Sequence, residues 1–262
     1  MKDILVQLDG GEVSSRRLDA ALLLAKRFEA RLTGLFAQKE SDPAALVARR
    51  PSAHLEAAAT NSLQNFEEAT SAAGVEAQWR SLAHGDPGFL VAETGYCARY
   101  FDLALVGQGS FDYSPLPDDL VERVVAESGR PVLVIPQSGA PATLGSHAII
   151  AWNGSRESSR ALHDALPLLR RAERVTLLTV PPDDKTPPHE ILHLDAIDHL
   201  ARHQVTAKLE RIRAEDIGLM DFLLSRAYDL GADLLVMGAP AGKGSGTRFL
   251  LRHLTLPVLI SG

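Results

Sequence analysis

The chain contains the same series of strand-like segments twice, and this duplication limits what it can fold into. The first half reads ILVQLDG (4–10), DLALVG (102–107) and RPVLVIP (130–136), and the second half reads AIIAWNG (148–154), DLLVMG (233–238) and LPVLIS (256–261). Three landmarks in the same order indicate a duplicated unit of about 130–140 residues, which is too long for a solenoid repeat of roughly 20–50 residues. The sequence therefore predicts two related domains, 1–139 and 146–262, joined by a turn-rich linker near residue 140.

Short apolar runs alternate with amphipathic segments in both halves. The run 3–9 reads as a buried parallel strand, and the segment 18–28 that follows it has the apolar spacing of a helix, with Ser14 or Ser15 available as its N-cap. Further helices are expected near 53–73, 88–100, 118–127, 156–171, 189–203, 217–230 and 247–253. Such alternation predicts an α/β fold with parallel strands, right-handed crossovers and helices on both faces of each sheet.

Composition excludes several classes of partner. The net charge is −6, whereas binding to a nucleic-acid backbone or to an anionic membrane surface needs a basic patch. No apolar run approaches the roughly 18–20 residues of a membrane span, and no signal-peptide cleavage pattern follows the N-terminus. Cys97 is the only cysteine, so no disulfide forms within the chain and a reducing cytoplasm is the expected location.

These pieces resemble a known family. The opening ILVQLDG segment, the early helix, the Val-Gly end of the fourth strand and the closing PVLV strand resemble a universal stress protein domain in each half. The segments AWNGSRE (151–157) and HLARH (199–203) resemble bacterial tandem members. The resemblance implies two open five-stranded parallel sheets of order 3-2-1-4-5, of the adenine nucleotide alpha hydrolase-like type. It also implies pairing of the halves as an intramolecular pseudo-dimer, with homodimerisation left open, and a stress-associated role, usually without catalysis.

One branch of that family binds ATP, and the first half matches its pattern only in part. Open parallel sheets bind ligands where the strand order reverses, here beside strands one and four. In the ATP-binding branch an acidic residue closing strand one contacts the adenosine, and Asp9 stands there. Glycines after strand four approach the phosphates, and Gly107 and Gly109 stand there with one intervening residue instead of two. Asp118 and Asp119 follow, either as charges that oppose a triphosphate or as carboxylates of a helical first turn.

The second half shows the opposite pattern. Asn153 replaces the acidic residue, while the loop GAPAGKGSGTR (238–248) carries groups that suit an anion at a helix start. Its candidate binding residues are Gly238, Gly242, Lys243, Gly244 and Ser245. The loop is shorter than the family pattern, so the alternative is a tight turn that holds no ligand.

A zinc-hydrolase pattern lies in the segment HEILHLDAIDH (189–199). His-Glu-x-x-His places two candidate zinc ligands, His189 and His193, one helical turn apart. The longer zinc-protease pattern needs glycine where this chain has Ala196, and on a continuous helix His199 points away from the other two. We therefore expect an amphipathic crossover helix here, with His189 and His193 as weak metal candidates only.

These observations predict a cytoplasmic, stress-response binding or regulatory module with degenerate nucleotide sites and no catalytic residues. A small molecule or a nucleotide is the expected partner, and no cofactor is assigned. Two alternatives stay open: an ATP-binding protein with slow hydrolysis, and a zinc-dependent hydrolase at 189–199.

Overall fold

The chain divides into two units in a computed structural model that describes residues 1–109, 114–138, 143–179, 195–211, 218–239 and 245–262. One unit comprises Met1–Ala140 and Leu251–Thr255, and the other comprises Pro141–Leu250 and Leu256–Gly262. None of the described helices is long and apolar enough to cross a membrane.

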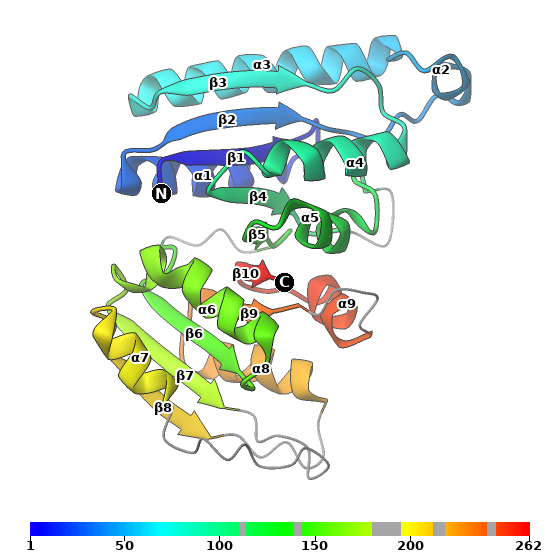
Figure 1. The fold of residues 1–262 in the computed structure, drawn as a ribbon. Helices are drawn as coiled ribbons and strands as arrows, with labels where there is room; N and C mark the ends of the chain where they lie inside the picture. The colour runs from blue at the N-terminus through cyan, green and yellow to red at the C-terminus, as the bar shows by residue number, and fades with distance from the viewer. Residues whose placement is uncertain (110–113, 139–142, 180–194, 212–217, 240–244) are drawn as a thin grey trace. The chain divides into compact units, whose positions relative to one another are not determined.

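The first unit is a five-stranded parallel sheet with helices on both faces. Its strands are β1 (Asp3–Leu8), β2 (Arg31–Phe36), β3 (Ala77–Ser81), β4 (Leu103–Gly107) and β5 (Val132–Ile135), in the spatial order β3-β2-β1-β4-β5. Its helices are α1 (Ser14–Phe28), α2 (Pro43–Ala48), α3 (Ala53–Ala73), α4 (Pro87–Ala98) and α5 (Leu120–Ser128). Helices α1 and α3 cover one face of the sheet, and α4 and α5 cover the other (Figure 1).

Burial explains why the central strands are mostly apolar. Every residue of β4 is buried, and so are the last five of the six residues of β1. Strands covered by helices on both faces have no solvent side, so the apolar pattern does not alternate. The same principle makes a polar residue inside such a strand informative, because burial without a hydrogen bond is costly. Gln7 is such a residue in β1, and it is fully buried.

The second unit repeats this arrangement. Its strands are β6 (His147–Trp152), β7 (Arg174–Thr179), β8 (Ala207–Arg211), β9 (Leu234–Gly238) and β10 (Val258–Ser261), in the order β10-β9-β6-β7-β8. Its helices are α6 (Arg156–Leu169), α7 (Ala196–Arg202), α8 (Leu219–Asp229) and α9 (Ser245–Arg252). Helices α6 and α7 cover one face, with α8 on the other (Figure 1). Numbered along each unit, both sheets have the order 3-2-1-4-5, and the predicted α/β fold class is confirmed.

Two local expectations differ from the structure. Helix α1 begins at Ser14, its N-cap position is Val13, and no side chain caps it. The Ser14 hydroxyl instead accepts a hydrogen bond from the backbone N–H of Asp9 at 3.1 Å, which ties the end of β1 to the helix start. Helix α2 was not expected, although Asp42 caps it and Pro43 opens it, both of which are common helix-start signals.

Candidate functional site

The strand order of the first unit reverses between β1 and β4. Asp9 directly follows β1, and Gly107 ends β4, so the structure brings these two predicted site residues to the same edge of the sheet. In an open parallel sheet this edge is where a ligand crevice forms. The side chain between them is Arg17, which comes from the first turns of α1 and is itself buried.

Arg17 and Asp9 form a buried ion pair. Arg17 Nη2 donates to Asp9 Oδ2 at 2.6 Å, and the two side chains are 4% and 3% exposed. Gln7 joins them, because its side-chain oxygen accepts from Arg17 Nη1 at 2.7 Å and its amide nitrogen lies 3.3 Å from Asp9 Oδ2. The other Asp9 oxygen accepts from the backbone N–H of Gly11 at 2.8 Å. Both oxygens of the Asp9 carboxylate therefore accept hydrogen bonds from groups of the first unit itself.

The guanidinium occupies the space that Gly107 leaves open. A Cβ atom placed on Gly107 would lie 1.8 Å from Arg17 Nη1 and 3.0 Å from Leu116 Cδ1. The crevice lined by Asp9, Arg17 and Gly107 has a volume of only about 50 Å³. Small-molecule sites usually measure about 300–1,000 Å³, so this crevice does not accommodate a nucleotide in the present arrangement.

Loops of the same unit close the edge of the sheet above this crevice. The Gln38 side chain accepts from the backbone N–H of Gly10 at 2.7 Å. The backbone N–H of Lys39 donates to the carbonyl of Pro115 at 2.8 Å. These bonds join the loops that follow β1, β2 and β4, so the crevice is closed by main chain as well as by Arg17.

The remaining predicted residues of this loop lie apart from the ion pair. A Cβ atom on Gly109 would meet only the carbonyl oxygen of Asp118, at 3.8 Å. Asp118 and Asp119 lie directly before α5, and no side chain caps that helix. Residues 110–113 lie outside the described part of the chain.

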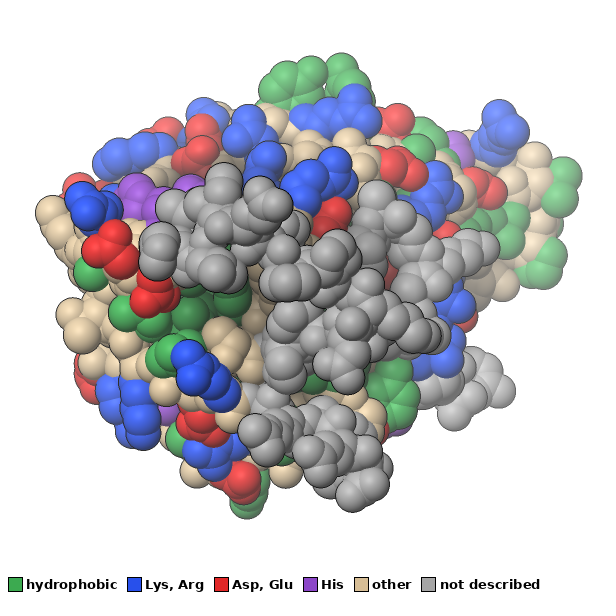
Figure 2. Space-filling model, turned by 60° about the horizontal axis from the view of Figure 1, so that its bottom comes forward, with side chains coloured by type: hydrophobic (Ala, Val, Ile, Leu, Met, Phe, Trp, Pro, Cys, Tyr) green, Lys and Arg blue, Asp and Glu red, His purple; other side chains and the backbone are tan. Residues whose placement is uncertain are grey.

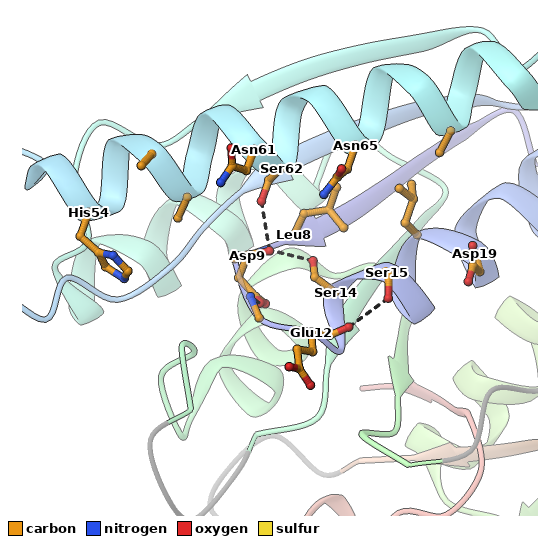
Figure 3. Close-up of a pocket in the computed structure, with 16 residues that line it drawn as sticks. Leu8, Asp9, Glu12, Ser14, Ser15, Asp19, His54, Asn61, Ser62 and Asn65 are labelled. Atoms are coloured by element: carbon orange, nitrogen blue, oxygen red, sulfur yellow. Dashed lines mark hydrogen bonds between the residues drawn. The ribbon is translucent and has the colours of Figure 1, made fainter.

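A larger cleft lies beside Asp9, between the start of α1 and the face of α3. Its volume is about 740 Å³, within the usual range for ligand sites. Its polar lining comprises Asp9, Glu12, Ser14, Ser15, Asp19, His54, Asn61, Ser62 and Asn65 (Figure 3). The Ser62 hydroxyl donates to the Asp9 carbonyl at 3.1 Å and so fixes α3 against the end of β1. Sequence analysis missed this cleft because its residues come from two helices far apart in the chain.

The second unit does not repeat the ion pair. Asn153 is exposed, and its side-chain oxygen accepts from the backbone N–H of Ser155 at 3.0 Å, a local turn contact. By the repeat, Ala151 stands where Gln7 stands and Ala161 stands where Arg17 stands. All three partners of the buried network are thus replaced together. The crevice edge of the second unit holds no arginine at the equivalent helix position.

Gly238 is the first residue of the predicted anion loop, and the structure describes it. A Cβ atom on it would lie 2.3 Å from the carbonyl carbon of Glu157, so β9 ends against the first turn of α6. Only glycine allows so close an approach between backbones. Gly242, Lys243 and Gly244 lie outside the described residues, and Ser245 is the first residue of α9.

The weak metal candidates are not tested by the structure. His189 and His193 lie outside the described residues, as does the first part of the helix expected over 189–203. The described part of that helix is α7, which begins at Ala196 and contains His199.

Arg17 is the site residue that sequence analysis missed, although two signals point to it. It lies one helical turn before Ala21 on the apolar face of α1, where a charged residue needs a buried partner. Gln7 interrupts an otherwise apolar strand in the same way. Each signal indicates a buried polar side chain, but neither identifies the residue with which that side chain pairs.

The surface in Figure 2 carries basic and acidic side chains side by side. On the described part of this face, blue and red groups are interspersed and no broad area is of one sign.

The fold is that of the universal stress proteins. A universal stress protein from Archaeoglobus fulgidus DSM 4304 aligns with 99% of this chain and 95% of its own length, at 18% identity and a TM-score of 0.75. A functionally unknown protein from Pseudomonas aeruginosa PAO1 aligns with 100% of this chain and 92% of its own, at 16% identity and a TM-score of 0.65. No protein-family model and no curated protein matches the chain. The fold that the sequence resemblance implied is confirmed.

Proposed function

We propose that this chain is a tandem universal stress protein that works as a non-catalytic binding module. In its first unit, Arg17 takes the place of a nucleotide. The main support for this proposal is the ion pair of Arg17 with Asp9, which lies in the crevice between β1 and β4. In the ATP-binding branch of the family, the acidic residue at this position contacts adenosine. In this chain the residue is Asp9, and Arg17 neutralises its charge. The proposal includes a stress-associated role and a cytoplasmic location.

The cleft between α1 and α3 is the proposed ligand site of the first unit. Its volume of about 740 Å³ fits a small molecule, and its hydroxyl and amide side chains offer hydrogen bonds. Glu12 and Asp19 add negative charge, which opposes a triphosphate and favours a neutral or cationic polar ligand.

A second candidate function is nucleotide binding by the second unit alone. The observation in its favour is that Ala151 and Ala161 replace Gln7 and Arg17, so the side chains at these two positions cannot form the equivalent ion pair. Gly238, packed on the first turn of α6, and Lys243 in the following loop are the residues proposed to lie near the phosphates. This candidate includes slow ATP hydrolysis.

Calorimetric titration with ATP and Mg²⁺ separates these proposals. We expect no micromolar ATP binding that depends on the first unit. The variants are Asp9→Asn for the first unit and Lys243→Ala for the second, each compared with wild type. Binding lost in Lys243→Ala and kept in Asp9→Asn would support the second candidate. Binding lost in Asp9→Asn and kept in Lys243→Ala would overturn the proposal for the first unit.

Release of inorganic phosphate from ATP tests the absence of catalysis. We expect no release above that of buffer with either variant or wild type. Release by wild type that disappears in Asp9→Asn or Lys243→Ala would show a catalytic function. Pairing of the two halves within the chain and homodimerisation stay predictions, and sedimentation of the full chain tests the second of them.

A further inference from the structure

Three histidines of the second unit lie together on α6 and at the end of α7. His163 comes from α6, and His199 and His203 come from α7 and the residue that caps it. The ring centroids are 4.8 Å apart for His163 and His199, and 4.6 Å apart for His199 and His203. One nitrogen from each ring lies within 4.8 Å of the other two. This grouping is independent of the nucleotide crevices described above.

Local structure explains how the three rings meet. His199 and His203 are four residues apart, and the backbone N–H of His203 lies 3.3 Å from the carbonyl of His199, so their side chains lie on one helical face. The end of α6 is tied to the end of α7, because Arg170 Nε donates to the carbonyl of His203 at 2.9 Å. This tie brings His163 to the other two rings.

Two of the rings present a nitrogen that is available to a ligand. His163 Nδ1 lies 2.8 Å from the carbonyl oxygen of Ser159 and donates to it, which leaves the lone pair of Nε2 free. Histidine ligands of metals are commonly oriented by such a bond from their other nitrogen to a backbone carbonyl. His199 Nε2 is buried and has no hydrogen-bond partner among the described residues. Burial and the neighbouring imidazoles also lower the pKa of His199.

We propose that His163, His199 and His203 bind one divalent transition-metal ion of the kind that prefers imidazole, with Zn²⁺ as the first choice. Imidazole ligands suit Zn²⁺, Cu²⁺ and Ni²⁺, and three histidines leave a coordination position for water. Zinc–nitrogen bonds of about 2.1 Å in a tetrahedral site place the ligand nitrogens about 3.4 Å apart. The rings therefore move together by roughly 1 Å when the ion binds, which small side-chain rotations supply.

One neighbouring cation competes with the metal ion. Arg170 Nη2 donates to His203 Nδ1 at 3.2 Å, and coordination through His203 releases this contact or reverses the tautomer of the ring. Asp198 lies beside His199 on α7 and pairs with Arg202 at 3.0 Å, so it is not a ready fourth ligand. Among the described residues the site thus offers three imidazole nitrogens and no ready carboxylate. That donor set disfavours Mg²⁺ and Ca²⁺, which prefer oxygen ligands.

The test is a calorimetric titration of the untagged chain with ZnCl₂. The zinc that stays bound after dialysis is then measured. We expect one equivalent of zinc in wild type. Loss of a partner outside the ligand shell typically weakens binding about 10–100-fold, so His163→Gln or His199→Gln should weaken it at least about tenfold. His253→Gln, a matched change at an exposed histidine directly after α9, should leave affinity unchanged.

A further variant separates this site from the His189/His193 pair. His189→Gln with His193→Gln should keep the bound equivalent, because the proposed ligands are His163, His199 and His203. Circular dichroism checks that each variant is folded, and His163 is exposed, so its substitution leaves the core intact. The proposal is overturned if wild type binds no zinc. It is equally overturned if binding survives His163→Gln and His199→Gln, or is lost only in the His189/His193 variant.

Discussion

Arg17 Nη2 lies 2.6 Å from Asp9 Oδ2, and both side chains are buried at the edge of the sheet where its strand order reverses. The pair joins α1 to the end of β1 and fills the space beside Gly107. The Asp9 carboxylate is therefore part of the buried framework of the first unit. The stability of the first unit should depend on this pair.

Removing one partner of the pair should destabilise the first unit strongly. Breaking a buried ion pair leaves an uncompensated charge and typically costs about 3–5 kcal/mol, so Arg17→Ala should lower the free energy of unfolding by about that amount. Urea unfolding followed by Trp79 fluorescence in a Trp152→Phe background reports on the first unit, because these are the two tryptophans of the chain.

The second unit supplies a matched control for this prediction. A triple variant with Gln7→Ala, Asp9→Asn and Arg17→Ala installs the residue set that the second unit has at equivalent positions. No buried charge then remains unpaired, so this variant should be more stable than Arg17→Ala alone. A triple variant that is less stable than the single one would contradict the role we give to the buried charge.

Gly107→Ala should destabilise the protein only while Arg17 is present. The added methyl would lie 1.8 Å from Arg17 Nη1, and overpacking of this kind costs about 1–3 kcal/mol. In an Arg17→Ala background the added cost should fall below about 1 kcal/mol, and a double-mutant cycle measures the difference. Equal costs in both backgrounds would show that Gly107 is needed for another reason, such as its approach to Leu116.

His147 should make the stability of the second unit depend on pH. Burial, followed by the charge of Arg174, lowers the pKa of this ring, while the Leu230 carbonyl and Asp233 act in the opposite direction. An unfolded histidine has a pKa of about 6.5, so below that pH the unfolded chain binds a proton that the folded unit resists. Stability from this residue is therefore complete above about pH 6.5 and decreases as the pH falls towards the folded pKa.

The His147→Gln variant provides the comparison. Glutamine keeps hydrogen-bonding groups but does not titrate, so unfolding curves between pH 7.5 and 5 should slope less steeply for the variant than for wild type. Trp152 fluorescence in a Trp79→Phe background follows the second unit. Parallel slopes would mean that His147 contributes nothing to the pH dependence.

Glu40 should stabilise the loop between β2 and α3. Its Oε1 accepts from the backbone N–H groups of Ser41 and Asp42 at 2.8 and 2.9 Å, and its Oε2 accepts from that of Ser52 at 2.8 Å. Burial alone raises the pKa of this carboxyl, but these bonds outweigh it and the net pKa is lowered. Glu40→Ala should therefore cost about 1–3 kcal/mol at neutral pH, the usual effect of leaving such donors unpaired.

The same lowered pKa sets the pH window of the Glu40 effect. The contribution should be present above the unfolded glutamate pKa of about 4.3 and decrease as the pH falls through the folded value. Glu67→Ala, at an exposed position of α3, is the matched control and should change stability little. If Glu67→Ala lowered the free energy of unfolding as much as Glu40→Ala, the effect would not depend on the hydrogen bonds of Glu40.

Much of the fold could be predicted because its signals are local. The apolar runs that became β4 and β9 are continuous, and Ser52 marks the start of α3 as Gly74 marks its end. The start of α1 could not be placed by the same rules. Ser14 looks like a cap, but its hydroxyl bonds to Asp9, a contact that depends on how the strand meets the helix.

The sequence by itself determined two related α/β units with parallel strands, because the apolar periodicity and the order of strands and helices are properties of short segments repeated along the chain. It also placed Asp9 and Gly107 at strand ends. Only the tertiary structure decided that Arg17 lies between them, and that His163 meets His199 and His203. These contacts depend on how helices pack on a sheet and on one another, which no local pattern specifies.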